Sequence, residues 1–97
     1  MALIAEQDGR PLGCVYVALP DEHFGYVFGL YVRPEARRQG LGRRLMREVA
    51  VSLQREGRRY VVLNVDTPNL PGRALYEQLG FVDAARTLRA EVDDLLR

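Results

Sequence analysis

The first third of the chain alternates short hydrophobic runs with turn residues, a pattern typical of β-strands. Asp-Gly stands between "ALIAEQ" and "PLGCVYVAL", and this dipeptide between β-prone segments indicates a hairpin. The pattern predicts strands over 2–7 and 12–19, and the run "FGYVFGLYV" predicts a third over 24–32. Gly25 and Gly29 inside this third run indicate a bulge or a close approach of another backbone.

Further along, the hydrophobic spacing changes to that of an amphipathic helix. The apolar positions recur every three or four residues, at Leu41, Leu45, Val49 and Leu53. A helix over 40–56 follows, with Gly57 as its left-handed stop. The nearly continuous apolar run at 59–66 is typical of a strand covered on both faces. Strand, crossover helix and strand together predict a right-handed βαβ unit.

A shorter helix is predicted over 70–79, with Asn69 as its cap and Gly80 as its stop. The tail after Phe81 fits two structures. Its spacing fits a helix through Leu88, Val92, Leu95 and Leu96, whereas Leu88, Ala90 and Val92 alternate as a strand does. The spacing taken alone favours the helix.

Composition narrows the class of protein. A chain of 97 residues supports one domain with one modest core. The net charge of +1 argues against a general polyanion binder, and the single cysteine, Cys14, excludes an intrachain disulfide and a cysteine-based metal cluster. No run is long enough to span a membrane, and the start is too short and too acidic for a signal peptide. We expect a soluble cytoplasmic protein that holds no metal.

The start of the long helix carries an unusual set of charges. Helix N-termini favour acidic side chains, but five arginines surround this one: Arg37, Arg38, Arg43, Arg44 and Arg47. Gly42 in the first turn costs about 1 kcal/mol relative to alanine. A bound polyanion accounts for both features, because free N–H groups and arginines bind it and glycines let the backbone approach it. The alternative is a solvated helix face next to loop glycines.

Two common diphosphate motifs do not fit this stretch. A dinucleotide fingerprint needs a third small residue where the chain has Leu45, and its turn follows the strand directly. A Walker motif needs a lysine, and all 14 basic residues here are arginine.

The segment "LYVRPEARRQGLGRRLM" instead resembles the acyl-CoA-binding motif of the GNAT superfamily of N-acyltransferases, Arg/Gln-x-x-Gly-x-Gly/Ala, with Arg37, Gly40 and Gly42 in its fixed positions. "NLPGRALYEQLGF" resembles the second motif of the family. The matching residues are Asn69, Tyr76, Gly80 and Phe81, while Gly72 stands where alanine is usual. The resemblance implies an α+β fold with a mostly antiparallel sheet, one parallel and splayed strand pair (24–32 and 59–66), and a strand at 86–93.

The resemblance also implies where acetyl-CoA binds. Its pyrophosphate lies on the turn formed by Arg37, Arg38, Gln39, Gly40, Leu41, Gly42 and Arg43. Its pantetheine arm lies between the splayed strands, held by Leu30, Tyr31, Val32, Asn64 and Asn69, mainly through backbone groups. An N–H group of this strand polarises the thioester carbonyl. Tyr76 is the family's usual general acid toward the departing thiolate, although a helix tyrosine is often only a core residue.

The chain departs from the family pattern in two places. Many relatives carry a glutamate base at or near Phe28, so no base is evident here, and His23 and Tyr26 are only neighbours of that position. The family usually opens with a strand and two helices that wall the acceptor pocket, whereas this chain begins at the following hairpin. Either the chain is a short member whose acceptor site is open, or a second subunit supplies the missing wall. The uncovered strand edge and apolar surface favour a homodimer.

The sequence thus predicts an acetyl-CoA-dependent N-acetyltransferase acting on an amine of a small molecule or a protein. The alternative is a CoA-binding regulatory or assembly module with little catalysis. A nucleic-acid binder would explain the arginines but not Gly40, Gly42 or the segment at 69–76, so we expect no nucleic-acid partner and no membrane partner.

Overall fold

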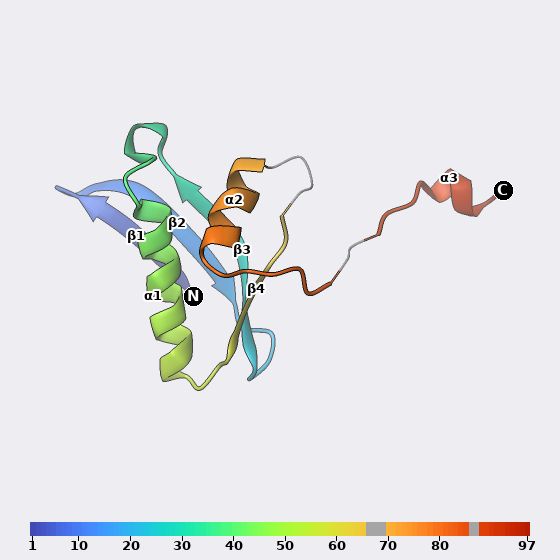
Figure 1. Ribbon diagram of the computed structural model, residues 1–97, viewed down its shortest axis with the longest axis horizontal. Coiled ribbons are helices and arrows are strands. Elements are labelled where there is room, and N and C mark those ends of the chain that lie inside the picture. The colour runs from blue at the N-terminus through green and yellow to red at the C-terminus, as the bar shows by residue number, and fades with distance from the viewer. Residues whose placement is uncertain (66–69, 86–87) are drawn as a thin grey trace.

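The computed structural model describes residues 1–65, 70–85 and 88–97 of the chain. Along the sequence these form β1 (Ala2–Gln7), β2 (Arg10–Ala18), β3 (Phe24–Val32), a 3-10 turn η1 (Pro34–Ala36), α1 (Leu41–Arg55), β4 (Tyr60–Leu63), α2 (Leu70–Gln78) and α3 (Val92–Leu95). The strands form one sheet in the order β1-β2-β3-β4 (Figure 1). The α+β class predicted from the sequence is confirmed, with a single parallel strand pair among the described residues.

The predicted N-terminal hairpin is confirmed. β1 and β2 are antiparallel and are joined through Asp8 and Gly9, whose φ angles are 53° and 78°. Two consecutive positive φ angles are the geometry of the two-residue turn that Asp-Gly favours. Continuing the meander, β2 and β3 are also antiparallel.

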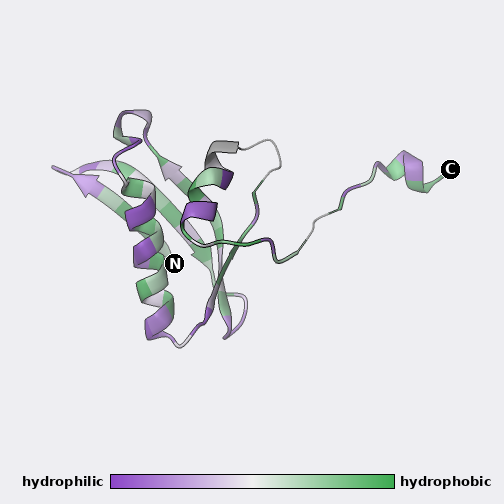
Figure 2. Ribbon diagram, in the orientation of Figure 1, coloured by the Kyte–Doolittle hydropathy of each residue, from purple (hydrophilic) through white to green (hydrophobic). Residues whose placement is uncertain are grey.

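Helix α1 covers one face of the sheet and forms the core with it. The buried side chains come from the sheet and from the predicted helix stripe: Val15, Val17, Val27, Leu45, Met46, Val49 and Leu53. Figure 2 shows the matching split of α1 into hydrophobic and hydrophilic positions. Gly25 explains how closely the helix approaches β3, because a Cβ there would lie 2.8 Å from both Cδ atoms of Leu53.

Strands β3 and β4 part within the sheet. Their parallel pairing runs from Phe24 opposite Tyr60 to Val27 opposite Leu63, while β3 continues to Val32. On the other side of β3 the register shifts, since Tyr16 pairs with Gly29 and Val17 with Val27. Phe28 is therefore the extra residue of a bulge beside Gly29, at the point where the two strands separate.

Two predicted strands differ from the structure. β4 is shorter than 59–66, because Asn64 and Val65 are described but are not paired, and position 66 lies outside the described residues. The strand expected at 86–93 is wrong over its described part, 88–93, where the chain runs away from the sheet and ends in α3 (Figure 1). Alternating side chains do not make a strand without a neighbouring edge, and Asp93 and Asp94 favour a helix N-terminus.

No helix among the described residues is both long and apolar enough to cross a bilayer. The bounds of α1 and α2 differ from the predicted ones by one residue at most at each end. Asn69, the predicted cap of α2, lies outside the described residues.

Candidate functional site

The turn before α1 exposes backbone donors. Gly40 is the N-cap of the helix in a left-handed conformation, with φ 77° and ψ 11°. The described residues provide no side-chain hydrogen bond to this cap, and the first turn contains no acidic residue. Because first-turn N–H groups have no partner within the helix, those of Leu41, Gly42 and Arg43 point out of its start. Such a start is suited to an anion.

The predicted phosphate-binding side chains divide into two groups. The Nε of Arg37 donates to the Val32 carbonyl at 2.9 Å, and its guanidinium lies 5.9 Å from the centroid of the Tyr31 ring. Gln39 donates from Nε2 to the Glu35 carbonyl at 3.4 Å. These two side chains brace the turn. Arg38 and Arg43 are instead exposed, and the described residues form no ion pair with either.

The second half of β3 has a free edge. The N–H of Arg33 donates to the Leu12 carbonyl of the β2 side at 2.8 Å. Since backbone groups alternate along a strand, the N–H groups of Leu30 and Val32 point the opposite way, into the gap that β4 leaves. The backbone N–H and C=O of Tyr31 are directed toward β2. Its part in this region is therefore the contact of its ring with the Arg37 guanidinium.

A hollow of about 160 Å³ lies where β3 and β4 part. Its walls come from both strands and from α2, and they comprise Tyr26, Val27, Phe28, Gly29, Leu30, Leu63, Asn64 and Tyr76. The structure therefore brings the predicted residues Leu30, Asn64 and Tyr76 together.

Tyr76 presents a protonated phenol to this hollow. It is partly buried, its ring meets that of Phe81 edge-on at 5.6 Å between centroids, and its carbonyl accepts the N–H of Phe81 at 3.0 Å. Burial raises the pKa of Tyr76 above its ordinary value, because the phenolate is the form that burial penalises. The phenol therefore keeps its proton at neutral pH and can donate it.

On the strand side of the hollow, Asn64 and Tyr26 are joined. The Nδ2 of Asn64 donates to the Tyr26 hydroxyl at 2.9 Å. In the sequence Tyr26 stands out only as a neighbour of Phe28, and the signal that could have singled it out is its position in β3, two residues before the bulge.

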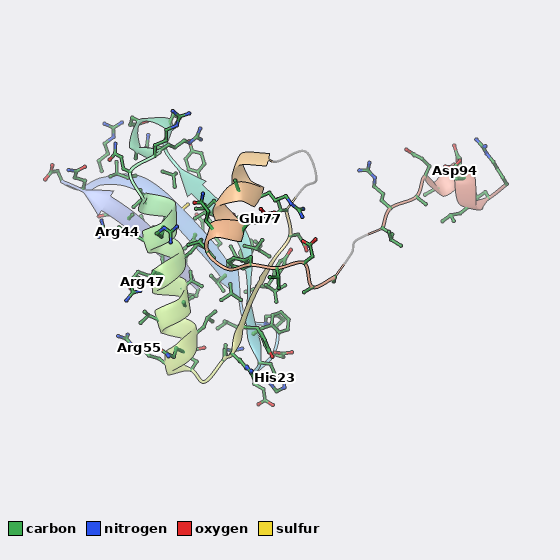
Figure 3. All side chains as sticks on the ribbon, viewed as in Figure 1. His23, Arg44, Arg47, Arg55, Glu77 and Asp94 are labelled. Atoms are coloured by element: carbon green, nitrogen blue, oxygen red, sulfur yellow. The ribbon has the colours of Figure 1, made fainter. Side chains whose placement is uncertain are left out.

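Two other residues considered in the sequence lie differently. His23 is exposed, its carbonyl accepts the N–H groups of Arg59 and Tyr60, and Figure 3 shows it at the end of the sheet away from Glu77 of α2. It does not reach the hollow. Phe28 is 61% exposed, with its ring stacked 5.8 Å from that of Tyr16.

Comparison with known proteins identifies the family to which the chain belongs. Residues 1–81 match the acetyltransferase (GNAT) family. The chain belongs to the GNAT acetyltransferase family. The predicted resemblance is confirmed, and the match spans the turn before α1, the splayed strands and α2.

Individual GNAT relatives match only in part of their own length. Mycothiol acetyltransferase of Thermomonospora curvata is 38% identical over 78 residues, which cover 80% of this chain and 26% of the relative. The crystal structure of the ribosomal-protein-S18-alanine N-acetyltransferase from Escherichia coli matches 96% of this chain and 61% of its own, with 28% identity and a TM-score of 0.81. A GNAT family acetyltransferase from Elizabethkingia anophelis, crystallised with acetyl-CoA bound, matches 87% of this chain and 55% of its own, with 18% identity and a TM-score of 0.82.

Proposed function

We propose that this protein binds acetyl-CoA and transfers its acetyl group to an amine. The observation that carries the proposal is the separation of β3 from β4 after Val27 and Leu63, which opens a backbone edge beside an anion-binding turn. The chain spans about a quarter of the mycothiol acetyltransferase and 61% of the S18-alanine acetyltransferase structure that it resembles. Those enzymes, and the acetyl-CoA-bound relative, support the same chemistry here.

The residues present fit the two ends of acetyl-CoA. The N–H groups of Leu41, Gly42 and Arg43 would hold the diphosphate, and the exposed guanidinium groups of Arg38 and Arg43 would add charge. The edge of β3 would pair with the amides of the pantetheine arm, as a strand edge pairs with an added strand.

Within β3, the N–H groups of Leu30 and Val32 are the available donors, since Arg37 already occupies the Val32 carbonyl. A donor of this edge next to the hollow would polarise the thioester carbonyl. Tyr76 would give its proton to the departing sulfur, and its raised pKa means that the phenol is protonated at the pH of the reaction. Asn69 lies outside the described residues, and its contact with the pantetheine arm stays a prediction.

Calorimetry with CoA, followed by an assay of thiol release from acetyl-CoA, tests the proposal. We expect saturable binding of CoA and amine-dependent release of thiol. Binding without release would favour the second candidate, a CoA-binding regulatory or assembly module, for which the aromatic Phe28 at the expected base position is the supporting observation. Absence of CoA binding by folded protein would refute both.

The homodimer and the cytoplasmic location stay predictions. The sheet face opposite α1 supports a homodimer, because Ile4, Tyr16 and Tyr31 on it are 59%, 43% and 52% exposed. Sedimentation of the protein at micromolar concentration tests this, and a monomer would contradict it.

A further inference from the structure

The walls of the hollow between β3 and β4 come from both faces of the sheet. Val27 and Leu63 pack into the core on the α1 side, and successive side chains of a strand alternate between faces. Tyr26 and Asn64, their direct neighbours, therefore lie on the opposite face. α2 belongs to the α1 side, since Leu79 and Phe81 at its end pack against the same core. Tyr76 thus approaches the hollow from one face, and the Tyr26–Asn64 pair from the other.

The hydrogen bond between Tyr26 and Asn64 determines which of their polar groups are available to a ligand. Asn64 donates from Nδ2 to the Tyr26 hydroxyl at 2.9 Å. The carboxamide oxygen of Asn64 remains an acceptor, and the phenolic proton of Tyr26 remains a donor. The Asn64 oxygen and the Tyr26 hydroxyl lie side by side. Together they can bind a ligand group in which an N–H donor and an oxygen acceptor are two or three bonds apart.

We propose that Tyr26 and Asn64 bind the acceptor, an inference that rests on the proposed acetyl transfer. The acceptor is an α-amine next to a carbonyl, as at the N-terminus of a peptide. The Asn64 oxygen accepts an N–H of the amine, and the Tyr26 hydroxyl donates to the neighbouring carbonyl oxygen. The aromatic ring of Phe28, which also lines the hollow, packs against the first side chain of the peptide.

The chemistry of Asn64 favours the same class of amine. A carboxamide takes up no proton, so the amine must arrive uncharged. An α-amine has an ordinary pKa of about 8 and is partly uncharged near neutral pH, whereas a lysine side chain, with a pKa of about 10.4, is almost entirely charged.

In the transfer step the nitrogen lone pair forms a C–N bond to the acetyl carbonyl carbon, and the C–S bond breaks with its electron pair on sulfur. Sulfur takes a proton from Tyr76, which regains one from solvent, while the amine nitrogen loses one proton to solvent. The products are an N-acetyl peptide and free CoA thiol, so atoms and charge balance.

The test uses two probes, alanyl-alanine amide as the α-amine and N-acetyl-lysine amide as the side-chain amine, with thiol release as the readout. We expect kcat/KM for the alanyl probe to exceed that for the lysine probe at least about tenfold near neutral pH. Tyr26→Phe and Asn64→Leu should each raise KM for the alanyl probe by about five- to tenfold, the loss of one hydrogen bond.

The matched control is Tyr60→Phe, the same change at an exposed tyrosine of β4 whose ring lies beside Arg59. It should leave KM unchanged, and the affinity for CoA should be unchanged in Tyr26→Phe and in Tyr60→Phe. An unaltered KM in Tyr26→Phe, a preference for the lysine probe, or transfer to neither probe by protein that binds CoA would overturn the inference. Loss of CoA binding in the wild-type protein would instead refute the proposed function.

Discussion

Gly42 of α1 faces Leu75 of α2, because a Cβ on Gly42 would lie 3.5 Å from the Cδ2 of Leu75. This is an ordinary van der Waals distance for one carbon atom, and it leaves little space for more. The contact joins the turn proposed to bind the diphosphate to the helix that carries Tyr76, the next residue after Leu75. A side chain at position 42 therefore affects both parts of the candidate site.

Gly42→Val adds two further methyl groups beside Leu75 and crowds the first-turn N–H groups. The added side chain blocks the approach of a phosphate to these N–H groups, so we expect CoA affinity to fall at least about tenfold, the loss of a hydrogen bond to a charged group. Calorimetry measures the affinity, and circular dichroism checks that the fold is retained. Ala50→Val, an exposed β-branched substitution on the same helix, is the control and should leave CoA affinity unchanged. Equal affinities in the two variants would refute the phosphate-binding turn.

A second prediction compares alanine substitutions at Gly40 and Gly57. Their φ angles are 77° and 74°, and a Cβ on either would meet no atom within 4 Å. Alanine at each position therefore costs about 1–2 kcal/mol through backbone conformation rather than through contact. We expect Gly40→Ala and Gly57→Ala to lower the melting temperature to a similar extent.

The two variants should differ in binding. Gly40 caps the N-terminus of α1, where the diphosphate is proposed to lie, whereas Gly57 follows its C-terminus. Only Gly40→Ala should weaken CoA binding, as measured by calorimetry at a temperature where both variants are folded. Equal weakening in both would show that a general loss of stability, rather than the turn, governs the affinity.

Local sequence signals predicted most of the fold. The Asp8–Gly9 turn, the stripe from Leu45 to Leu53 and the positive φ of Gly57 each follow from a few neighbouring residues. The splayed strand pair came from the family resemblance, and its bulge was placed within one residue of Phe28 because Gly29 is unusual in a strand interior.

Features that depend on distant partners were not predictable in this way. The tail alternates like a strand, yet Leu88 and Val92 are 87% and 70% exposed without a strand beside them. The hydrogen bond between Tyr26 and Asn64 joins residues 38 positions apart. The partner of Arg37 was also not predictable. Its position in the motif suggests phosphate binding, but its Nε donates to the Val32 carbonyl.

Arg43 provides a test of the charges around the turn. It is exposed in the first turn of α1, whereas Arg55 is exposed in the last turn, where Figure 3 labels it. Arg43→Ala should lower CoA affinity by about three- to tenfold, since a hydrogen bond to a charged group contributes about 1 kcal/mol or more. The effect should shrink at high salt.

Arg55→Ala removes the same charge at the other end of the helix and serves as the control. Its CoA affinity should match that of the wild-type protein at both salt concentrations. A similar loss in both variants would mean that net charge, and not a bound diphosphate, attracts the ligand.

Tyr76→Phe tests the proton donor. The change removes one hydroxyl and little buried area, so we expect kcat to fall by about ten- to a hundredfold while the affinity for CoA stays the same. Because the pKa of Tyr76 is raised, the wild-type rate should not lose its acid until the pH exceeds the ordinary tyrosine value. A proportional loss of affinity and turnover would assign Tyr76 to packing instead.

The same group links stability to pH. Its pKa is higher in the folded than in the unfolded chain, so the folded state holds the proton more tightly. The contribution of Tyr76 to stability is therefore fully present below the unfolded pKa of about 10 and is lost as the pH rises through the folded value. Tyr76→Phe lacks this loss, so its free energy of unfolding should fall less steeply above about pH 10 than that of the wild-type protein. Urea titrations of both proteins across this range measure the difference, and parallel declines would show that the phenol is as solvated when folded as when unfolded.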